Sequence, residues 1–446
     1  MKRRLVILGA GESGVGAAVL GKQKQYDVFV SDKSVIDSKY KDVLVKEGVA
    51  FEENKHTVEQ IISADLVVKS PGIPNSTNLI EQLNEKGVLI VSEIEFASWY
   101  TNAKLIGITG SNGKTTTTSL VYHILQHSGL NVGIGGNIGK SFALQVARSD
   151  YDFYVLELSS FQLDGVDKLK LDVSVLLNIT PDHLDRYNNC FDEYVDSKFQ
   201  IIKNSDEHSV FIYNNDDTTI VNKIQQLNLL SRSYGFTSER LNGKGAGIEK
   251  GTLYIDINNP LRISEDVVSL KGKHNSYNIM ASAMVASTLN IKENNIIEAI
   301  GSFQPIAHRM ERVTNVNGVE YINDSKATNV DSTFYALESI SSNVIWIAGG
   351  VDKGNDYSQL IPLVKSKVQG MVCLGKDNKK LYEAFGNFVD QIDNATSADE
   401  AVQKASCMAK KGYTVLLSPA CASFDLFKNY EDRGEKFKQG IIKLNQ

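Results

Sequence analysis

The chain has few cysteines, and none forms a motif that indicates a metal cage or a disulfide framework. Four occur in 446 residues, at Cys190, Cys373, Cys407 and Cys421, and no two are spaced as a CxxC pair. Zinc cages and disulfide-stapled folds need close or regular cysteine spacing, so neither class is indicated. The formal net charge is -6 and the pI about 5.8, which argues against nucleic acid as a partner.

Long apolar runs are also missing. No stretch approaches the roughly 20 residues of a membrane helix, so we expect no membrane insertion. Residues 1–8 resemble the start of a secretion signal, but glycines and Glu12 interrupt the apolar run too early. We interpret the segment as a buried first strand and expect a cytoplasmic monomer.

What is present is an ordinary globular composition, with 42% hydrophobic and 22% charged residues. Strand-like apolar runs alternate with helical stretches, which predicts parallel sheets with helices on both faces. We predict an α/β protein of three domains: a Rossmann-like domain at 1–92, a central P-loop mononucleotide-binding domain at 93–302 and a second Rossmann-like domain at 303–446. Residues 240–259 are rich in Gly, Asn and Lys and predict turns with a small hairpin.

Polar and small residues gather where the predicted strands end. Ligands of open parallel sheets bind beyond the carboxyl ends of the strands. The residues at these ends are Gly9, Asp32 and Ser70, then Gly110, Glu157 and 178–183, then Asp324, 349–353 and 418–423. A nucleotide site assembled from distant segments indicates an enzyme that joins two substrates and is driven by ATP.

The sequence GAGESG at residues 9–14 follows a strand and opens a helical stretch. Its glycines permit a tight turn, and the helix N-terminus then faces a diphosphate. Asp32 follows about 20 residues later, where an acidic side chain can meet a ribose hydroxyl. The motif fits NAD and a uridine diphosphate sugar equally, and the glycines can also serve close packing alone. The 70–74 turn can line the same ligand or be a plain loop.

The clearest motif is GSNGKT at residues 110–115, between a strand at 105–109 and a helix at 115–127. It has the outline of a P-loop, in which backbone N–H groups cradle phosphate, Lys114 neutralises charge and a threonine hydroxyl reaches Mg²⁺. Ile108 stands where the strict pattern has glycine, so this is a variant loop. A chance glycine turn is the alternative.

Three downstream residues have two interpretations each. Glu157 ends a strand beside the P-loop and suits Mg²⁺, or is an ordinary surface carboxylate. His183 is a ligand or a hydrogen-bonded structural histidine. Lys198 lies in a predicted helix at 191–203, and its position alone favours a solvated lysine.

The third predicted domain carries charged and hydroxyl side chains at its strand ends, which as a set indicate a site for a small dicarboxylate. They are Asp324, Lys326, Lys353 and Ser423. Arg309 and His308 near the domain entrance can meet ATP. Taken singly, each of these residues is better interpreted as a surface charge, and Cys421 as a small buried residue rather than a reactive thiol.

Together these motifs resemble the Mur ligases, the ATP-dependent amide-forming enzymes of peptidoglycan synthesis. The resemblance covers residues 9–434. GSNGKT at 110–115 is similar to the nucleotide loop of the whole family. DSKATN at 324–329 and SPACAS at 418–423, followed by FKNY at 427–430, are similar to the D-glutamate-adding member. The DNPR segment typical of the diamino-acid-adding member does not occur in the sequence.

The resemblance implies UDP-N-acetylmuramoyl-L-alanine and D-glutamate as substrates, with ATP, two Mg²⁺ ions and a carbamate on Lys198. Implied UDP-substrate contacts are Ser13, Asp32, Ser70, Gly72 and Asn137. Implied ATP contacts are Gly110, Ser111, Asn112, Gly113, Lys114, Thr115, Thr116, Asn275, Arg309 and Asp324. Implied D-glutamate contacts are Thr328, Lys353, Ser423 and Tyr430, and implied Mg²⁺ ligands are Thr115, Glu157, His183 and Lys198. The implied catalytic residues are Lys114, His183 and Lys198.

Two positions depart from the family pattern: Glu12 stands where the family is usually apolar, and Tyr430 where it often has Phe. The implied mechanism passes through an acyl phosphate. Three alternatives stay open: a nicotinamide-dependent dehydrogenase based on residues 9–14, a non-catalytic nucleotide-binding scaffold, and another amide ligase such as a sister Mur enzyme or folylpolyglutamate synthase.

Overall fold

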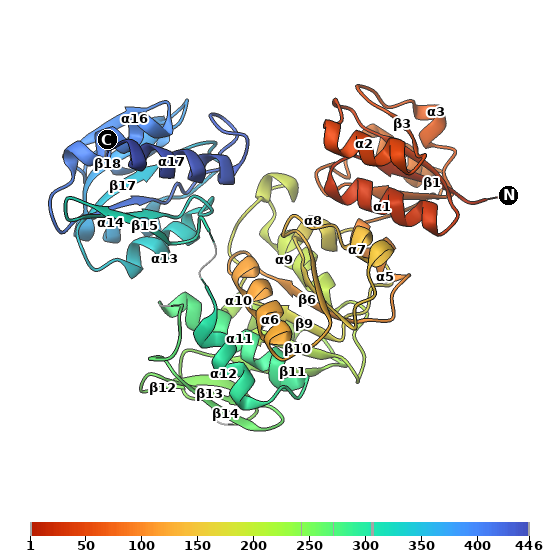
Figure 1. Ribbon diagram of the computed structural model, residues 1–446, viewed down its shortest axis with the longest axis horizontal. Helices are drawn as coiled ribbons and strands as arrows, with labels where there is room; N and C mark the ends of the chain where they lie inside the picture. Colours follow the sequence, from red (N-terminus) through yellow and green to blue (C-terminus); the bar gives the residue numbers. More distant parts are fainter. Residues whose placement is uncertain (1, 242, 271, 305–306, 445–446) are drawn as a thin grey trace. The chain divides into compact units, whose positions relative to one another are not determined.

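The structure is a computed structural model that describes residues 2–241, 243–270, 272–304 and 307–444 (Figure 1). It divides into two compact units, Met1–Phe303 and Gln304–Gln446. The first unit contains two sheets and the second contains one, so the prediction of an α/β protein with three sheet-containing domains is confirmed. The predicted outer limits at 1 and 446 lie outside the described residues.

The first sheet is parallel, with strand order β3-β2-β1-β4-β5. Residues 5–8 of β1 are fully buried, as expected for a strand covered on both faces. The elements are β1 (Arg4–Leu8), α1 (Glu12–Gln23), β2 (Asp27–Ser31), α2 (Ser38–Lys46), β3 (Ala50–Glu52), α3 (Val58–Ile61), β4 (Leu66–Lys69), α4 (Asn78–Glu85) and β5 (Leu89–Val91).

The second sheet has the order β14-β13-β12-β11-β10-β9-β6-β8-β7. It is parallel from β7 to β12 and ends in antiparallel β12-β13-β14, which contains the predicted hairpin. Its strands are β6 (Lys104–Thr109), β7 (Val132–Gly136), β8 (Phe153–Glu157), β9 (Val173–Leu176), β10 (Val210–Asn214), β11 (Arg232–Phe236), β12 (Gly245–Glu249), β13 (Thr252–Asp256) and β14 (Pro260–Ser264). Its helices are α5 (Glu93–Ser98), α6 (Lys114–His127), α7 (Phe142–Arg148), α8 (Ser160–Leu163), η1 (Leu184–Arg186), α9 (Phe191–Phe199), η2 (Gln200–Ile202), α10 (Thr218–Gln225), α11 (Lys273–Thr288) and α12 (Glu293–Ser302).

One apolar core runs across both sheets of the first unit. Helices α1, α5 and α7 contribute buried side chains to it, including Leu20, Phe96 and Phe142. Helix α1 packs closely on α7 because Gly16 lacks a side chain: an added Cβ would lie 1.9 Å from Ser141 Oγ. The two sheets of the first unit are therefore held together by one apolar core and by the packing of α1 on α7.

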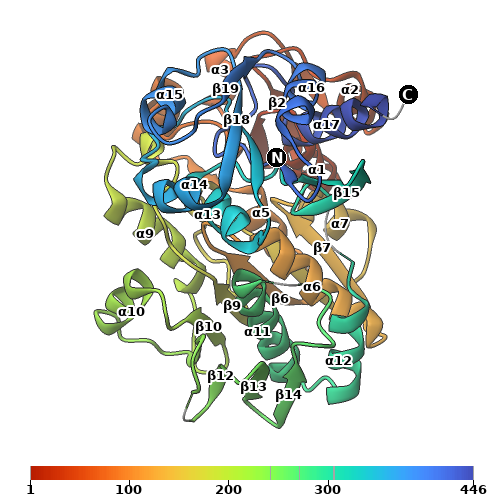
Figure 2. The same ribbon diagram turned by 90° about the vertical axis from the view of Figure 1, so that its left-hand side faces the viewer.

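The second unit has the strand order β15-β16-β20-β17-β18-β19 and is parallel except for β15. One core, around Trp346, packs under α13 to α15, and the other, around Phe437, packs under α16 and α17. Figure 2 shows α13 to α15 on one side of this sheet and α16 and α17 on the other. The elements are β15 (Glu311–Val316), β16 (Val319–Asn323), α13 (Val330–Ser339), β17 (Val344–Ala348), η3 (Ser358–Leu360), α14 (Ile361–Lys367), β18 (Val368–Leu374), α15 (Lys379–Phe385), β19 (Ile392–Ala395), α16 (Ala398–Met408), β20 (Thr414–Leu417) and α17 (Tyr430–Leu444).

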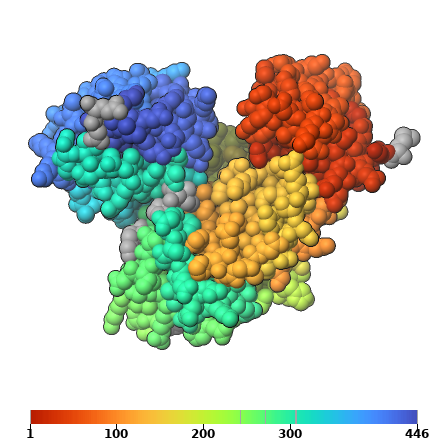
Figure 3. Space-filling view, in the orientation of Figure 1, coloured from red at the N-terminus to blue at the C-terminus, as the bar shows by residue number. Residues whose placement is uncertain are grey.

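Side chains fill the gaps that the ribbons leave inside each unit, as the space-filling view shows (Figure 3). Among the described residues, no helix has the length and apolar character needed to cross a bilayer.

Candidate active site

The P-loop wraps around its own lysine. Gly110 and Gly113 have φ angles of 156° and 82°, a region that side chains disfavour, and Gly113 directly precedes α6. Lys114 Nζ donates to the carbonyl oxygens of Gly110 and Ser111, both at 2.7 Å. The ammonium therefore lies against the loop, where a bound phosphate would meet it.

Ser111 and Asn112 fasten the P-loop to the segment that follows β9. Thr180 N donates to Ser111 Oγ at 3.0 Å, and Asn112 N donates to Asn178 Oδ1 at 2.8 Å. His183 lies three residues beyond Thr180, with a left-handed φ of 55° and its ring 5.1 Å from that of Phe161. The structure thus brings the loop of His183 to the P-loop.

Lys198 is not the solvated lysine that its position in the sequence favours: its relative exposure is 1%. Its ammonium lies 4.8 Å from the centre of the Tyr194 ring, and Tyr194 OH is 3.0 Å from Ser111 Oγ. Burial, together with the nearby Lys114 ammonium, holds the pKa of Lys198 well below its usual value. The neutral amine is favoured as a result, and it is the form that reacts with carbon dioxide.

Glu157 is buried at the end of β8 and only half satisfied. Its Oε1 accepts a 2.8 Å hydrogen bond from Asn137 Nδ2, while its Oε2 has no partner among the described residues. The hydroxyls of Thr116 and Thr180 are likewise buried without a partner among those residues. Buried polar atoms rarely stay unpaired, so these oxygens fit a bound cation or phosphate.

Among the described residues there is no cluster of three or more His, Cys, Asp and Glu side chains that could hold a metal ion. Mg²⁺ does not need one, since it usually keeps water and takes one or two protein carboxylates together with substrate phosphates. The oxygen of Glu157 and the hydroxyl of Thr115 suit that coordination.

Asn275 is linked to the P-loop through Asn278, which sequence reasoning missed. Asn278 Nδ2 donates to Asn275 Oδ1 at 3.1 Å, and its own Oδ1 accepts from Thr117 Oγ1 at 3.1 Å. A Cβ at Gly113 would lie 2.4 Å from Asn278 Oδ1, so the glycine makes this contact possible. Spacing of three residues on one helix face was the available signal.

In the N-terminal sheet, Asp32 holds the glycine loop. Its Oδ2 accepts from Ala10 N at 2.7 Å and its Oδ1 from Ser34 N at 2.8 Å. A Cβ at Gly9, whose φ is 96°, would lie 2.8 Å from Ser70 Cβ. The predicted UDP-substrate residues Asp32 and Ser70 thus both lie against the glycine loop, and Ser13 lies in the first turn of α1.

The third set of predicted residues belongs to the second unit, where three loops converge. Ala420 N donates to Ala327 O at 3.0 Å, and Val351 forms an antiparallel bridge with Ala422. These contacts join the loops that carry Thr328, Lys353 and Ser423.

Asp324 lies beneath these loops and is buried. Its oxygens accept from Met310 N at 3.1 Å and Ser418 Oγ at 3.0 Å. Burial raises its pKa to about 7, although the guanidinium of Arg309 favours the charged form. Arg309 Nε is itself buried without a partner among the described residues, so it retains a donor for a ligand.

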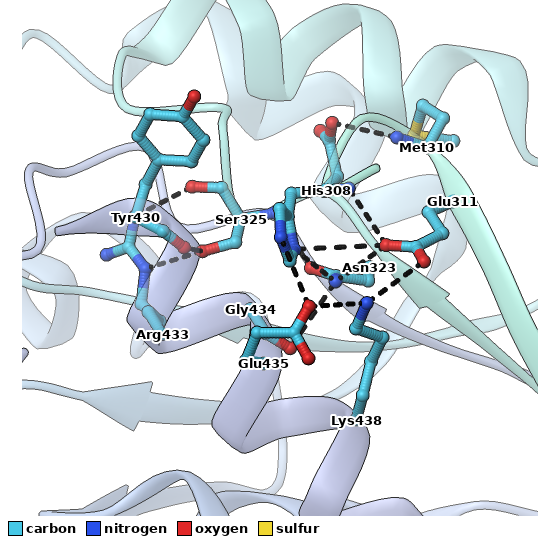
Figure 4. Close-up of polar contacts among 11 residues, drawn as sticks. His308, Met310, Glu311, Asn323, Ser325, Tyr430, Arg433, Gly434, Glu435 and Lys438 are labelled. Atoms are coloured by element: carbon cyan, nitrogen blue, oxygen red, sulfur yellow. Dashed lines mark hydrogen bonds and ion pairs between the residues drawn. The ribbon is translucent and has the colours of Figure 1, made fainter. Parts of the chain in front are cut away.

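Arg433 on α17 binds all three loops and was missed by sequence reasoning. It is 1% exposed and donates to Ser325 O at 2.9 Å, as Figure 4 shows. It also donates to Gly349 O at 3.3 Å and to Cys421 O at 3.2 Å. Tyr430, at the start of the same helix, accepts from Ser325 Oγ through its backbone oxygen at 2.8 Å. No signal in the sequence singles out Arg433, because a charged residue in a helix normally lies on its solvated face.

A second network lies beside Arg433 (Figure 4). Asn323 Nδ2 is 2.9 Å from His308 Nδ1 and 3.0 Å from Glu311 Oε2. Lys438 on α17 pairs with Glu311 at 3.2 Å and with Glu435 at 2.7 Å. The segment before β15, which carries His308 and Arg309, is thereby fixed to the last helix.

Comparison with known proteins assigns the chain to a family. Family models match residues 4–79 (MurD N-terminal domain), 108–286 (Mur ligase middle domain) and 308–421 (Mur ligase, glutamate ligase domain). These matches and the relatives described next show that the chain belongs to the Mur ligase family. The predictions of this family and of an ATP-dependent amide-bond-forming ligase are confirmed.

Two relatives named UDP-N-acetylmuramoylalanine--D-glutamate ligase illustrate the similarity. The protein of Christiangramia forsetii is 52% identical, with 100% of both chains covered. That of Bacteroides fragilis is 50% identical, covering 99% of this chain and 100% of its own. Among solved structures, UDP-N-acetylmuramate-alanine ligase MurC from Thermotoga maritima has a TM-score of 0.63 at 16% identity, with 99% of this chain and 100% of that chain covered, which supports the fold.

Proposed function

We propose that this protein joins D-glutamate to UDP-N-acetylmuramoyl-L-alanine at the expense of ATP, in cytoplasmic peptidoglycan precursor synthesis. The observation that carries the proposal is full-length similarity, at 48–52% identity, to relatives that bear the name of this activity. The DSKATN and SPACAS loops support it, since the structure joins them into one cluster beside Lys353.

The chemistry proposed has two steps. A carboxylate is a poor acylating agent, so its oxygen first attacks the γ-phosphorus of ATP, and ADP leaves. The amine of D-glutamate then attacks the carbonyl carbon of this acyl phosphate, and inorganic phosphate leaves as the amide forms. Both steps depend on positioning and on neutralising negative charge more than on acid–base chemistry.

The geometry of the first unit supports the following residue roles. Lys114 would neutralise phosphate charge, while Thr115, Glu157 and His183 would hold Mg²⁺. Bound there, Mg²⁺ would supply further charge neutralisation for the transferring phosphoryl group. The low pKa of Lys198 supports a carbamate there, because its amine is kept uncharged. A carbamate would give Mg²⁺ an anionic oxygen, which an ammonium cannot.

The remaining implied contacts are proposals of the same kind. Ser13, Asp32, Ser70, Gly72 and Asn137 bind the UDP-substrate. Gly110, Ser111, Asn112, Gly113, Thr116, Asn275, Arg309 and Asp324 bind ATP. Thr328, Lys353, Ser423 and Tyr430 bind D-glutamate.

The test is phosphate release from ATP with UDP-N-acetylmuramoyl-L-alanine and a panel of amino acids. We expect release with D-glutamate and none above background with L-glutamate or a diamino acid. Release with a different amino acid would assign the protein to a sister activity. If no amino acid causes phosphate release and the fluorescence is quenched when NADH is added, the dehydrogenase alternative is favoured.

A further inference from the structure

A single side chain, Arg186, spans two loops that are far apart in the sequence. Its Nη2 donates to Pro71 O at 3.2 Å and its Nη1 to Gly72 O at 3.4 Å. Both acceptors belong to the turn after β4 that is proposed to hold the UDP-substrate. Bonds from a cation to carbonyl oxygens are stronger than those between neutral groups, and a planar guanidinium fixes two acceptors at once.

The other side of Arg186 is anchored in the central domain. Its guanidinium carbon lies 4.5 Å from the centre of the Phe161 ring, and its backbone N donates to His183 O at 2.9 Å. The Phe161 ring also packs edge-on against the ring of His183, at 5.1 Å. The same residue therefore contacts the turn at 70–74 and sets the conformation of the segment that carries His183.

The surroundings of Arg186 are strongly charged. Lys69 lies close enough that burial, together with Arg186, lowers its pKa to about 8, and Asp164 acts on both cations. Asp164 in turn accepts hydrogen bonds from Tyr187 OH at 3.0 Å and from Ser197 Oγ at 2.5 Å, next to Lys198. Hydrogen bonds and charge interactions thus link the 70–74 turn to the segment that carries Lys198.

We propose that Arg186 is a positioning residue that couples UDP-substrate binding at the 70–74 turn to the placement of His183. This inference rests on the proposed function and extends it. When the turn is held by the substrate, Arg186 keeps its two carbonyl contacts and its place on Phe161, and the His183 segment keeps one conformation. Without the guanidinium, the two loops become independent of each other.

The chain supplies a matched control. Arg148 on α7 also joins the N-terminal sheet domain to the central one, with its Nη2 3.5 Å from Glu47 Oε1. Arg148 lies at the end of α7 and Glu47 directly after α2, so this partly exposed pair is away from the strand-end loops. Arg148→Ala therefore removes an interdomain contact of similar kind without touching either loop.

Two quantities are measured in wild type, Arg186→Ala, Arg186→Lys and Arg148→Ala after circular dichroism has shown that each is folded. The first is the Kd for UDP-N-acetylmuramoyl-L-alanine by calorimetry without ATP, and the second is the Mg²⁺ concentration for half-maximal phosphate release. We expect both to rise about tenfold in Arg186→Ala, the loss typical of charged hydrogen bonds. Arg186→Lys should fall in between, because lysine keeps the charge but cannot bind two carbonyls while lying flat on Phe161.

Arg148→Ala should keep both values within twofold of wild type. A folded Arg186→Ala in which either quantity is unchanged overturns the coupling, and so does an equal shift in Arg148→Ala. Wild-type protein that binds no UDP-substrate would overturn the proposed function itself, which separates the two failures.

Discussion

At the scale of single residues, burial decides the chemistry of Lys198. Its low pKa follows from the loss of water and from the neighbouring Lys114, since both disfavour a second positive charge. We expect Lys198→Ala to lose activity by a factor on the order of 10² or more while staying folded, as when a group that stabilises transition-state charge is removed.

Lys198→Arg tests the carbamate more directly, since arginine keeps a positive charge but forms no carbamate. In ¹³C-bicarbonate, the wild type should give a carbamate NMR signal that Lys198→Arg lacks. Activity within a few-fold of wild type in Lys198→Ala would remove the residue from the chemistry.

Glu93 is a second residue whose burial has a measurable consequence. Its Oε1 accepts from Ser141 Oγ and Ala143 N, whereas Oε2 has no partner among the described residues. Burial raises its pKa from 4.5 to about 7. The folded state therefore binds the proton more tightly than the unfolded state, and this carboxyl lowers the stability as pH rises from about 4.5 to about 7.

Glu93→Gln keeps both accepted hydrogen bonds and cannot ionise. We expect the free energy of unfolding of the variant, relative to wild type, to increase by on the order of 3 kcal/mol across that pH range and to level off above it. Urea unfolding of both proteins at several pH values measures the difference. A difference in the free energy of unfolding that does not change with pH would show that the pKa of Glu93 is not raised.

Sequence reasoning located most candidate residues because they follow strands, yet it misjudged or missed those whose importance lies in burial. Lys198 was indistinguishable from a solvated lysine, and Arg433 from a surface charge, because burial depends on what packs against a helix from elsewhere in the chain. The contact of Asn278 with the P-loop requires the absence of a side chain at Gly113, which is distant in sequence.

At the scale of elements, one glycine of α17 leaves room for the side chain of His308. A Cβ on Gly434 would lie 2.2 Å from His308 Nδ1, so this helix carries glycine where the histidine ring packs. We expect Gly434→Ala to lower the free energy of unfolding by about 1–3 kcal/mol, the usual cost of overpacking, measured by urea denaturation.

A second background tests the cause. In His308→Ala the obstruction is gone, and alanine is favoured over glycine inside a helix by about 0.5–1 kcal/mol. Gly434→Ala should therefore stabilise that variant. The same destabilisation in both backgrounds would rule out the histidine as the reason.

Strands illustrate the same limit of sequence reasoning at this scale. Apolar runs such as β1 and β6 are recognised in the sequence, whereas β7, with the sequence VGIGG, is not. Its glycines are needed because its neighbours approach closely: a Cβ on Gly133 would lie 2.6 Å from the Tyr154 ring. A strand that has glycines because its neighbours lie close to it lacks the apolar pattern by which strands are recognised.

At the scale of the whole molecule, the division at residue 303 has a testable meaning. The second unit has its own sheet and two cores, so we expect a fragment of residues 304–446 to fold alone and to melt cooperatively by circular dichroism. A shorter fragment that ends before α17 loses Phe437 and Ile441 from one core and should melt without a cooperative transition. Failure of the longer fragment to fold would mean that the unit depends on the rest of the chain.

The position of Arg433 in the chain also determines when the three loops of the second unit can be joined during synthesis. Its guanidinium joins loops at Ser325, Gly349 and Cys421, but Arg433 itself is translated almost last. A nascent chain still held on the ribosome can complete the P-loop domain while the three loops of the second unit lack their common anchor. A stop codon that deletes only the final helix would therefore yield a protein with an assembled P-loop and three loops of the second unit that nothing joins.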